Sequence, residues 1–190
     1  MNTLEIIAVA LGLANVGLLV RRSIWNYPFG MAMVALYVTI FWEAKLYGEA
    51  GLQVFFFLVQ GWGWYLWARA GGLEHAVAVG WMRWPTRIVS LAIVGIVTIT
   101  LGTLMHRLTD AAMPFADAAI TGASVVAQVL LSIRRIENWI LWIAVDIGAV
   151  ALYIERGLNL TAGLYVAFLA LATMGLVEWI RAARRGEAPA

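Results

Sequence analysis

Seven long apolar runs, separated by short polar stretches, constrain this chain more than any other feature of its sequence. A run of about 20 apolar residues is long enough to cross a bilayer as a helix. In hydrocarbon each backbone amide must be hydrogen-bonded within its own segment, so every run should be helical. We therefore predict an all-α membrane protein with seven transmembrane helices. The runs are Leu4–Val20, Pro28–Trp42, Gly51–Trp67, Ile88–Met105, Pro114–Ile133, Trp139–Ile154 and Leu160–Ile180.

The composition agrees with a membrane protein and argues against other classes. Hydrophobic residues make up 63% of the 190 residues and charged residues 13%, against roughly 45–50% and about 25% in soluble domains. The first run lacks a basic start and a cleavage site, which indicates a retained helix and not a signal peptide. Cysteine is absent, and both histidines, His75 and His106, lie in predicted loops. We expect no metal, no cofactor and no enzyme activity, and a net charge of +2 does not indicate nucleic-acid binding.

The basic residues are distributed unequally between the two ends of the predicted helices. Lys45, Arg107 and Arg156 fall at one end. The other ten fall at the opposite end: Arg21, Arg22, Arg69, Arg83, Arg87, Arg134, Arg135, Arg181, Arg184 and Arg185. By the positive-inside rule the N-terminus faces outwards and the C-terminus faces the cytoplasm. The loop at 70–87 is then a cytoplasmic connector whose role the sequence does not indicate.

The second half of the sequence repeats the first at a spacing of 112 residues without a gap. Matching pairs include Arg22/Arg134, Asn26/Asn138, Glu43/Glu155, Gly51/Gly163, Gly63/Gly175 and Trp67/Trp179. One extra helix between two three-helix copies gives both the same orientation, as in SWEET transporters. Such symmetry favours a binding site between the copies near mid-membrane, although a duplicated scaffold without a transport path is the alternative. We predict one transmembrane domain, 1–190, with repeat one at 1–70, a linker helix at about 88–105, repeat two at 114–182 and a cytoplasmic tail at 183–190.

Asp146 is the candidate site residue that the sequence singles out first. It lies in the middle of the sixth run, where a carboxylate costs about 2.5–3.5 kcal/mol on insertion scales, so it should face the bundle interior. Asn138, Trp142 and Asp146 are four residues apart and share one helix face. They predict a ligand site with an aromatic wall and an anionic anchor. A hydrogen-bonded structural Asp146 is the alternative, and Trp139 beside this stripe fits either the site or an interfacial aromatic belt.

The third run carries a second polar and aromatic pattern. Gln60 and Trp64 are four residues apart, and a buried glutamine needs a hydrogen-bond partner. Contact between helices is the alternative role for Gln60. Gln128 in the fifth run is a candidate of the same kind. Tyr37 and Tyr153 offer hydroxyl groups, but aromatic contact with lipid explains them equally well.

The abundance of tryptophan indicates the class of substrate. Ten of the 190 residues are tryptophan, and aromatic faces attract cations by about 0.5–2 kcal/mol each. Together with Asp146 they favour a small aromatic cation or a hydroxylated aromatic compound. A seven-helix retinal sensor is disfavoured, because the Schiff base needs an intramembrane lysine and Lys45 is the only lysine.

At these stretches the sequence resembles the PnuC family, the bacterial nicotinamide riboside transporters. The resemblance is carried by NYPFGM with Tyr37, by LQVFFFLVQGWGWYLW, by RRIENWILWIAVDI and by LYVAFLALATMGLVEW. It implies a three-plus-one-plus-three helix fold similar to SWEETs, facilitated diffusion of an unphosphorylated vitamin as an NAD precursor, a homotrimer in the inner membrane, and a cytoplasmic kinase that traps the substrate.

The resemblance also implies which residues contact the vitamin. These are Gln60, Trp64, Asn138, Trp142 and Asp146. One departure is Asp146, where asparagine is expected in some riboside transporters. Relatives of this fold similar to thiamine or riboflavin transporters leave those vitamins as alternatives.

Overall fold

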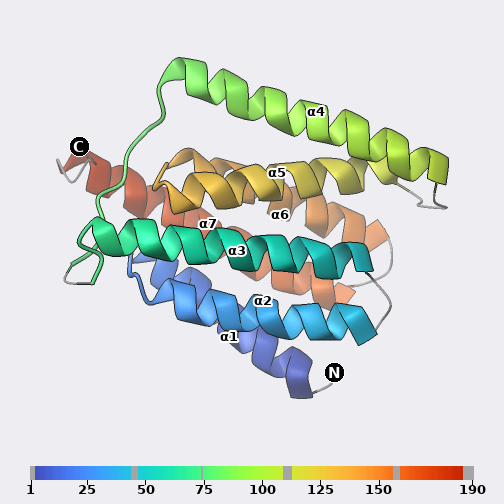
Figure 1. Ribbon diagram of the computed structural model, residues 1–190, viewed down its shortest axis with the longest axis horizontal. Coiled ribbons are helices and arrows are strands. Elements are labelled where there is room, and N and C mark those ends of the chain that lie inside the picture. The colour runs from blue at the N-terminus through green and yellow to red at the C-terminus, as the bar shows by residue number, and fades with distance from the viewer. Residues whose placement is uncertain (1–2, 44–46, 74, 109–112, 156–158, 186–190) are drawn as a thin grey trace.

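The structure is a computed structural model that describes residues 3–43, 47–73, 75–108, 113–155 and 159–185. The described residues form seven helices and no strand. Figure 1 shows the helices lying side by side as a bundle, with the marked chain ends at opposite ends of it. The helices are α1 (Thr3–Val20), α2 (Asn26–Glu43), α3 (Tyr47–Arg69), α4 (Trp84–Leu108), α5 (Pro114–Ser132), α6 (Glu137–Glu155) and α7 (Asn159–Arg184).

The observed helices agree with the predicted runs, and most differ by a few residues at their ends. Pro28 is the third residue of α2, within the first turn, where a missing amide hydrogen is tolerated. The prediction that both histidines lie in loops is wrong for His106, because α4 continues to Leu108 and includes His106 and Arg107 in its last turn. Basic side chains in a last turn interact favourably with the negative end of the helix dipole, which is consistent with this extension.

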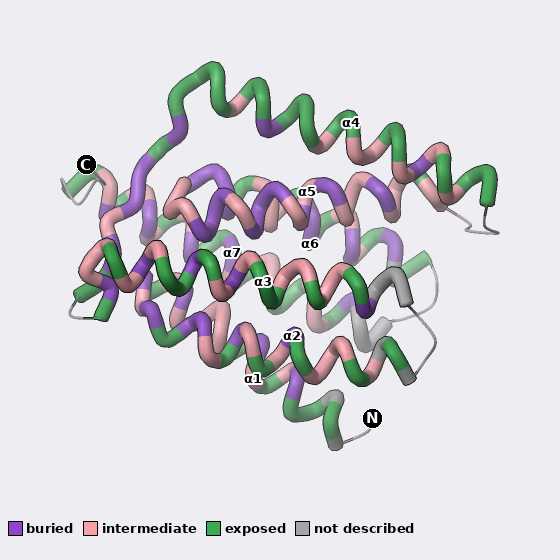
Figure 2. Tube along the Cα trace, in the orientation of Figure 1, coloured by how far each residue is buried: buried purple, intermediate pink, exposed green. Residues whose placement is uncertain are grey.

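Three of the described helices are long and apolar enough to cross a membrane by length and composition, and two shorter apolar segments accompany them. The three are Trp84–Leu108, Pro114–Ser132 and Ala162–Arg184, and the shorter segments are Ile6–Val20 and Asn26–Ile40. Helix α4 is the most exposed of the three, and Figure 2 shows most of it in the exposed and intermediate colours. Many of its exposed side chains are large and apolar, including Leu91, Ile96 and Ile99, which suits contact with lipid.

Helices α1–α3 and α5–α7 form two three-helix units with the same internal order. Within the units α2 packs against α1 and α3, and α6 packs against α5 and α7. Between the units α3 packs against α5 and α1 packs against α7. The shift of 112 residues exchanges these two contacts, so the units are related by a pseudo-two-fold axis along the bundle. Helix α4 joins them and packs only on α5 among the described helices.

Four aromatic rings on the pseudo-two-fold axis hold the two units together. Tyr27 and Trp67 meet edge to face with centroids 5.3 Å apart, and their equivalents Trp139 and Trp179 do so at 5.5 Å. Trp67 and Trp179 lie 6.1 Å apart across the axis. All four rings are at most 1% exposed, so this cluster is the centre of the protein core near the arginine-rich end of the bundle.

The turns before α2 and α6 have the same backbone structure. Arg22 and its equivalent Arg134 have positive φ angles of 56° and 62°, which non-glycine residues rarely adopt. The Asn26 side-chain amide donates to the carbonyl oxygen three residues earlier at 2.7 Å, and that of Asn138 does so at 2.6 Å. The sequence repeat is therefore also a repeat of local geometry.

The Arg134 guanidinium in the second of these turns is partly buried. Burial lowers its pKa, and the adjacent charge of Arg135 lowers it further.

Candidate functional site

Asp146 faces the interior of the bundle. Its side chain is 5% exposed, as expected for a carboxylate at bilayer depth. It lies nine residues after α6 begins, about 14 Å along the axis at 1.5 Å per residue. Within the described part of the chain, Asp146 has no hydrogen-bond or ion-pair partner. A buried acceptor group without a partner is available to a ligand.

Gln60 lies at a comparable depth in the other unit. It is 6% exposed and nine residues before the end of α3. Its side-chain oxygen and the Asn15 amide nitrogen both lie against Gly30, so closely that a Cβ at position 30 would overlap them. The Asn15 amide also donates to the Asn26 carbonyl oxygen at 2.7 Å. Gly30 therefore provides the space that two polar side chains, one from α1 and one from α3, occupy against α2.

Asn15 is a polar residue that the sequence analysis missed. It is half-buried in α1, and it is the one asparagine within the first apolar run. That signal resembles the one used for Gln60 and Gln128. The shift of 112 residues pairs Asn15 with Ala127, so it has no polar counterpart in the second repeat.

The two units fill this equivalent place with different chemistry. The positions of Gly30, Gln60 and Asn15 correspond to Trp142, Ala172 and Ala127 in the second unit. Trp142 is half-buried and packs against the aromatic core that includes Trp139 and Ala172. One unit therefore presents amide groups where the other presents an indole ring. This asymmetry suits a ligand with a polar part and a flat aromatic part.

Gln128 lies at the contact between the two units. It is 8% exposed on α5, one turn before Ser132. The Ser132 hydroxyl donates to the Gln128 carbonyl oxygen at 3.0 Å and lies 3.4 Å from the Val59 carbonyl oxygen of α3. The backbone of Gln128 is thus engaged at the α3–α5 seam.

Asn138 and Trp139 have structural roles at the start of α6. Asn138 is fully buried and its amide nitrogen is used within its own turn, as Asn26 does in the first unit. Its side-chain oxygen has no partner within the described residues. Trp139 belongs to the aromatic core and is 1% exposed. The interfacial-belt interpretation of Trp139 is therefore wrong, because Gly175 removes the bulk that would keep this ring out of the core.

The remaining predicted residues lie in different environments. Helix α3 buries Gln60, Gly63 and Trp67, whereas Trp64 is 37% exposed. Trp64 therefore lies at the edge of the buried face and does not share the full burial of Gln60. Tyr37 is half-buried on α2. The side chain of Tyr153 lies outside the described part of the chain.

Two grooves on the surface of the bundle lie away from the predicted site. Two shallow grooves run between α1 and α7, and both include Val20, Arg21 and Met174. None of the predicted site residues lines either groove. Asp146, Gln60 and Gln128 are each less than a tenth exposed, so this conformation gives solvent little access to them. Among the described residues no group of three or more histidine, aspartate or glutamate side chains gathers as a metal site.

Comparison with known proteins agrees with this architecture. Residues 2–181 match the family model described as nicotinamide mononucleotide transporter. The chain belongs to this family. It is 28% identical to the nicotinamide riboside transporter PnuC of Escherichia coli, over 97% of this chain and 87% of that protein. The riboflavin/roseoflavin transporter RibM of Streptomyces davaonensis is 27% identical over 97% of this chain and 88% of its own length.

A solved structure has the same fold. The crystal structure of the vitamin B3 transporter PnuC superimposes with a TM-score of 0.76 and 28% sequence identity, covering 96% of this chain and 82% of the other. The chain is therefore an all-α membrane transport protein with two parallel three-helix repeats joined by a linker helix.

Proposed function

We propose that this protein carries nicotinamide riboside across the bacterial inner membrane by facilitated diffusion. Relatives named for that substrate match nearly the whole chain. The observation that carries the proposal is that each repeat buries a polar side chain at a comparable depth, Asp146 one turn after Trp142 in one repeat and Gln60 in the other. These groups complement a positively charged pyridinium ring joined to a hydroxylated sugar.

The charge of this region favours the riboside over the phosphorylated mononucleotide. A phosphate group is bound in proteins by arginine, lysine or clustered backbone amides. In the described helices, the arginine residues lie within the first or last turns, far from the depth of Asp146. A phosphate near that carboxylate would meet a like charge. The unphosphorylated substrate avoids this repulsion.

The proposed direction of transport is inward. With the arginine-rich end in the cytoplasm, an inside-negative potential favours entry of one positive charge by about 2.3 kcal/mol per 100 mV. A cytoplasmic kinase would then retain the product by adding a phosphate. The proposal includes an N-terminus outside the cell, a cytoplasmic C-terminus and a homotrimer, as the family resemblance implies.

Riboflavin or thiamine is the second candidate substrate. The similarity to RibM supports riboflavin. Thiamine is an aromatic cation and would also suit Asp146. Riboflavin is neutral, so it gains no charge attraction from a carboxylate. The buried acid therefore favours the two cations, and the similarity to riboside transporters favours the first of them.

Calorimetric titration of the purified protein with nicotinamide riboside, nicotinamide mononucleotide, thiamine and riboflavin tests the proposal. We expect the riboside to bind at least about tenfold more tightly than the other three, equivalent to about 1.4 kcal/mol. Asp146→Ala should weaken that binding, because it removes the buried acceptor group. Glu155→Gln, an exposed change at the end of the same helix, is the control and should leave binding unchanged. Tighter binding of another compound would contradict the assignment.

A further inference from the structure

The segment 76–82 between α3 and α4, here called the strap, crosses the arginine-rich end of both repeats. Figure 1 shows the chain leaving the end of α3 and passing over this end of the bundle to the start of α4. Val77 and Val79 are fully buried and Met82 is 7% exposed. Such burial in a connection between helices indicates that the strap is part of the packed structure.

The first part of the strap rests on repeat one. The Gly72 amide donates to the Trp67 carbonyl oxygen at 3.0 Å, and a Cβ at Gly72 would meet the Val77 side chain at 2.9 Å. Val77 also faces Arg22: its amide donates to the Arg22 carbonyl oxygen at 3.4 Å, and the Arg22 guanidinium donates back to the Val77 carbonyl oxygen at 3.3 Å. Arg22 is 7% exposed, so this contact is closed to solvent.

The second part of the strap holds repeat two. The Gly80 amide donates to the Arg134 carbonyl oxygen at 3.2 Å, and the Ile136 amide donates to the Gly80 carbonyl oxygen at 3.0 Å. The Met82 amide donates to both oxygens of Glu137, at 3.0 and 3.1 Å. The two turns that the strap contacts, at Arg22 and Arg134, are equivalent under the sequence repeat. The strap therefore ties the same turn of each repeat to the other.

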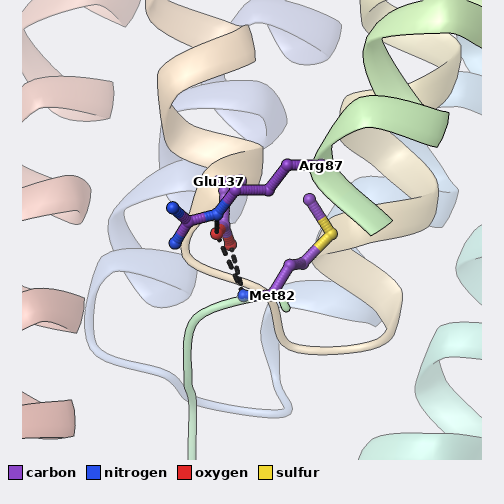
Figure 3. A network of polar contacts seen from close by, with 3 residues as sticks. All are labelled: Met82, Arg87 and Glu137. Carbon is purple, nitrogen blue, oxygen red and sulfur yellow. Dashed lines mark hydrogen bonds and ion pairs between the residues drawn. The ribbon is translucent and has the colours of Figure 1, made fainter. Parts of the chain in front are cut away.

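The Glu137 carboxylate has a second partner besides the strap, the Arg87 side chain. Figure 3 shows its carboxylate between the Met82 amide and the Arg87 side chain. Arg87 donates to it at 2.7 Å from α4, which packs on repeat two, and the Arg87 side chain is 35% exposed. If Met82 moved away, the ion pair with Arg87 would still satisfy this buried carboxylate, and water would reach the vacated position. Opening the contact with repeat two would therefore leave Glu137 paired, whereas opening the contact with repeat one would remove the hydrogen bond from the buried Arg22 guanidinium to Val77.

We propose that the strap is a latch that is released when the transporter opens at its arginine-rich end. The strap then stays bound to repeat one and leaves repeat two at Gly80 and Met82. Glu137, which accepts from the Met82 amide, holds the latch closed. Rocking of two repeats about a central site must separate their ends on one side of the membrane. In this structure the strap bonds to both ends, so that separation requires one contact to break. The proposal rests on the transport activity of the family and not on which vitamin is carried.

Two engineered disulfides test which contact breaks, in a chain that has no cysteine of its own. Gly80→Cys with Arg135→Cys joins the strap to repeat two at directly paired residues, whose spacing suits a disulfide. Arg22→Cys with Val77→Cys joins it to repeat one and is the matched control. Oxidation should abolish uptake of nicotinamide riboside into proteoliposomes by the first variant, and a reductant should restore it. The control should transport equally in both states. Equal loss in both variants, or no loss in the first, would overturn the proposal.

A second measurement needs no substrate and remains decisive if a double variant is damaged or the riboside is not carried. Val79 is a residue of the strap that is buried in the closed structure. A cysteine at this position (Val79→Cys) should react with a polar thiol reagent only when the strap lifts. Adding Glu137→Gln removes the charge of the group that accepts from the Met82 amide and should raise the labelling rate by about tenfold or more. Adding Glu155→Gln instead should leave the rate unchanged. Equal rates in the two backgrounds would show that Glu137 does not hold the strap, whereas failed riboside uptake by the wild type would count only against the proposed substrate.

Discussion

Gly175 and Gly30 show how single missing side chains shape this bundle. At Gly175 an added Cβ would overlap atoms of the Trp139 ring, and at Gly30 it would overlap the side-chain amides of Gln60 and Asn15. The first glycine makes room for the aromatic core and the second for a polar pair. The first requirement concerns the stability of the core, and the second concerns the proposed ligand site.

Gly175→Ala should destabilise the protein by about 1–3 kcal/mol, because the new methyl group overpacks the core against Trp139. Gly163→Ala lies on the same helix with nothing within 4 Å of its added Cβ. That control should be neutral or stabilising by up to about 1 kcal/mol, since alanine is the better helix former. Thermal unfolding in detergent, followed by tryptophan fluorescence, compares the two. A Gly175→Ala protein as stable as the control would refute the packing argument.

Gly30→Ala should weaken riboside binding by about tenfold or more, because the added methyl group would displace the Gln60 side chain from its position against Gly30. Gly61→Ala is the matched control, since its added Cβ would find only the Met31 side chain at 3.9 Å. Calorimetric titration measures both variants. Binding that is equal in the two would remove Gln60 from the proposed site.

At the scale of elements, the turns before α2 and α6 are two copies of one structure. Both have a positive φ arginine, and both are held by an asparagine amide that donates to the carbonyl oxygen three residues earlier. Asn26 and Asn138 make the same structural hydrogen bond, but only Asn138 was predicted to contact the substrate. Comparing variants of the two residues therefore distinguishes a structural role from a binding role.

Asn26→Ala and Asn138→Ala should each lower the free energy of unfolding by about 1 kcal/mol, the usual contribution of one hydrogen bond. If Asn138 also contacts the substrate, its variant should lose much more riboside affinity than that of Asn26. Denaturation and titration on the same samples give both quantities. Equal losses of affinity would leave Asn138 with its structural role alone.

At the scale of the whole molecule, the two repeats meet at Trp67 and Trp179 on the pseudo-two-fold axis. The strap closes the same end of the molecule from outside the helices. The predicted site residues lie further along the bundle, where Asp146 and Gln60 are nearly inaccessible. The arginine-rich end is therefore closed in the conformation seen here.

Trp67→Phe and Trp179→Phe should couple by about 0.5–1.5 kcal/mol in a double-mutant cycle of unfolding, the range measured for aromatic pairs. Trp84, on α4, is 69% exposed, so Trp84→Phe combined with Trp67→Phe should be additive. Coupling no greater than that of the control pair would show that the two repeats are not joined through these rings.

The sequence by itself determined the seven helices, their order and the relation between the two halves. Long apolar runs have one stable backbone structure in hydrocarbon, so helix positions follow from local composition. The repeat followed from pairs of glycine, asparagine and tryptophan at one spacing. Asp146 was predicted to face inwards because a carboxylate facing lipid is too unfavourable.

Only the tertiary structure decided which face of each helix is buried and what the loop at 70–87 does. A helix that is apolar on all sides carries no stripe to distinguish the core from lipid, so Trp139 and Trp64 could not be assigned from spacing alone. Asn15 and Gln60 both lie against Gly30, an arrangement that involves three helices. The strap is held by backbone atoms and by Glu137. Backbone hydrogen bonds between distant segments depend little on residue type, so the sequence does not reveal them.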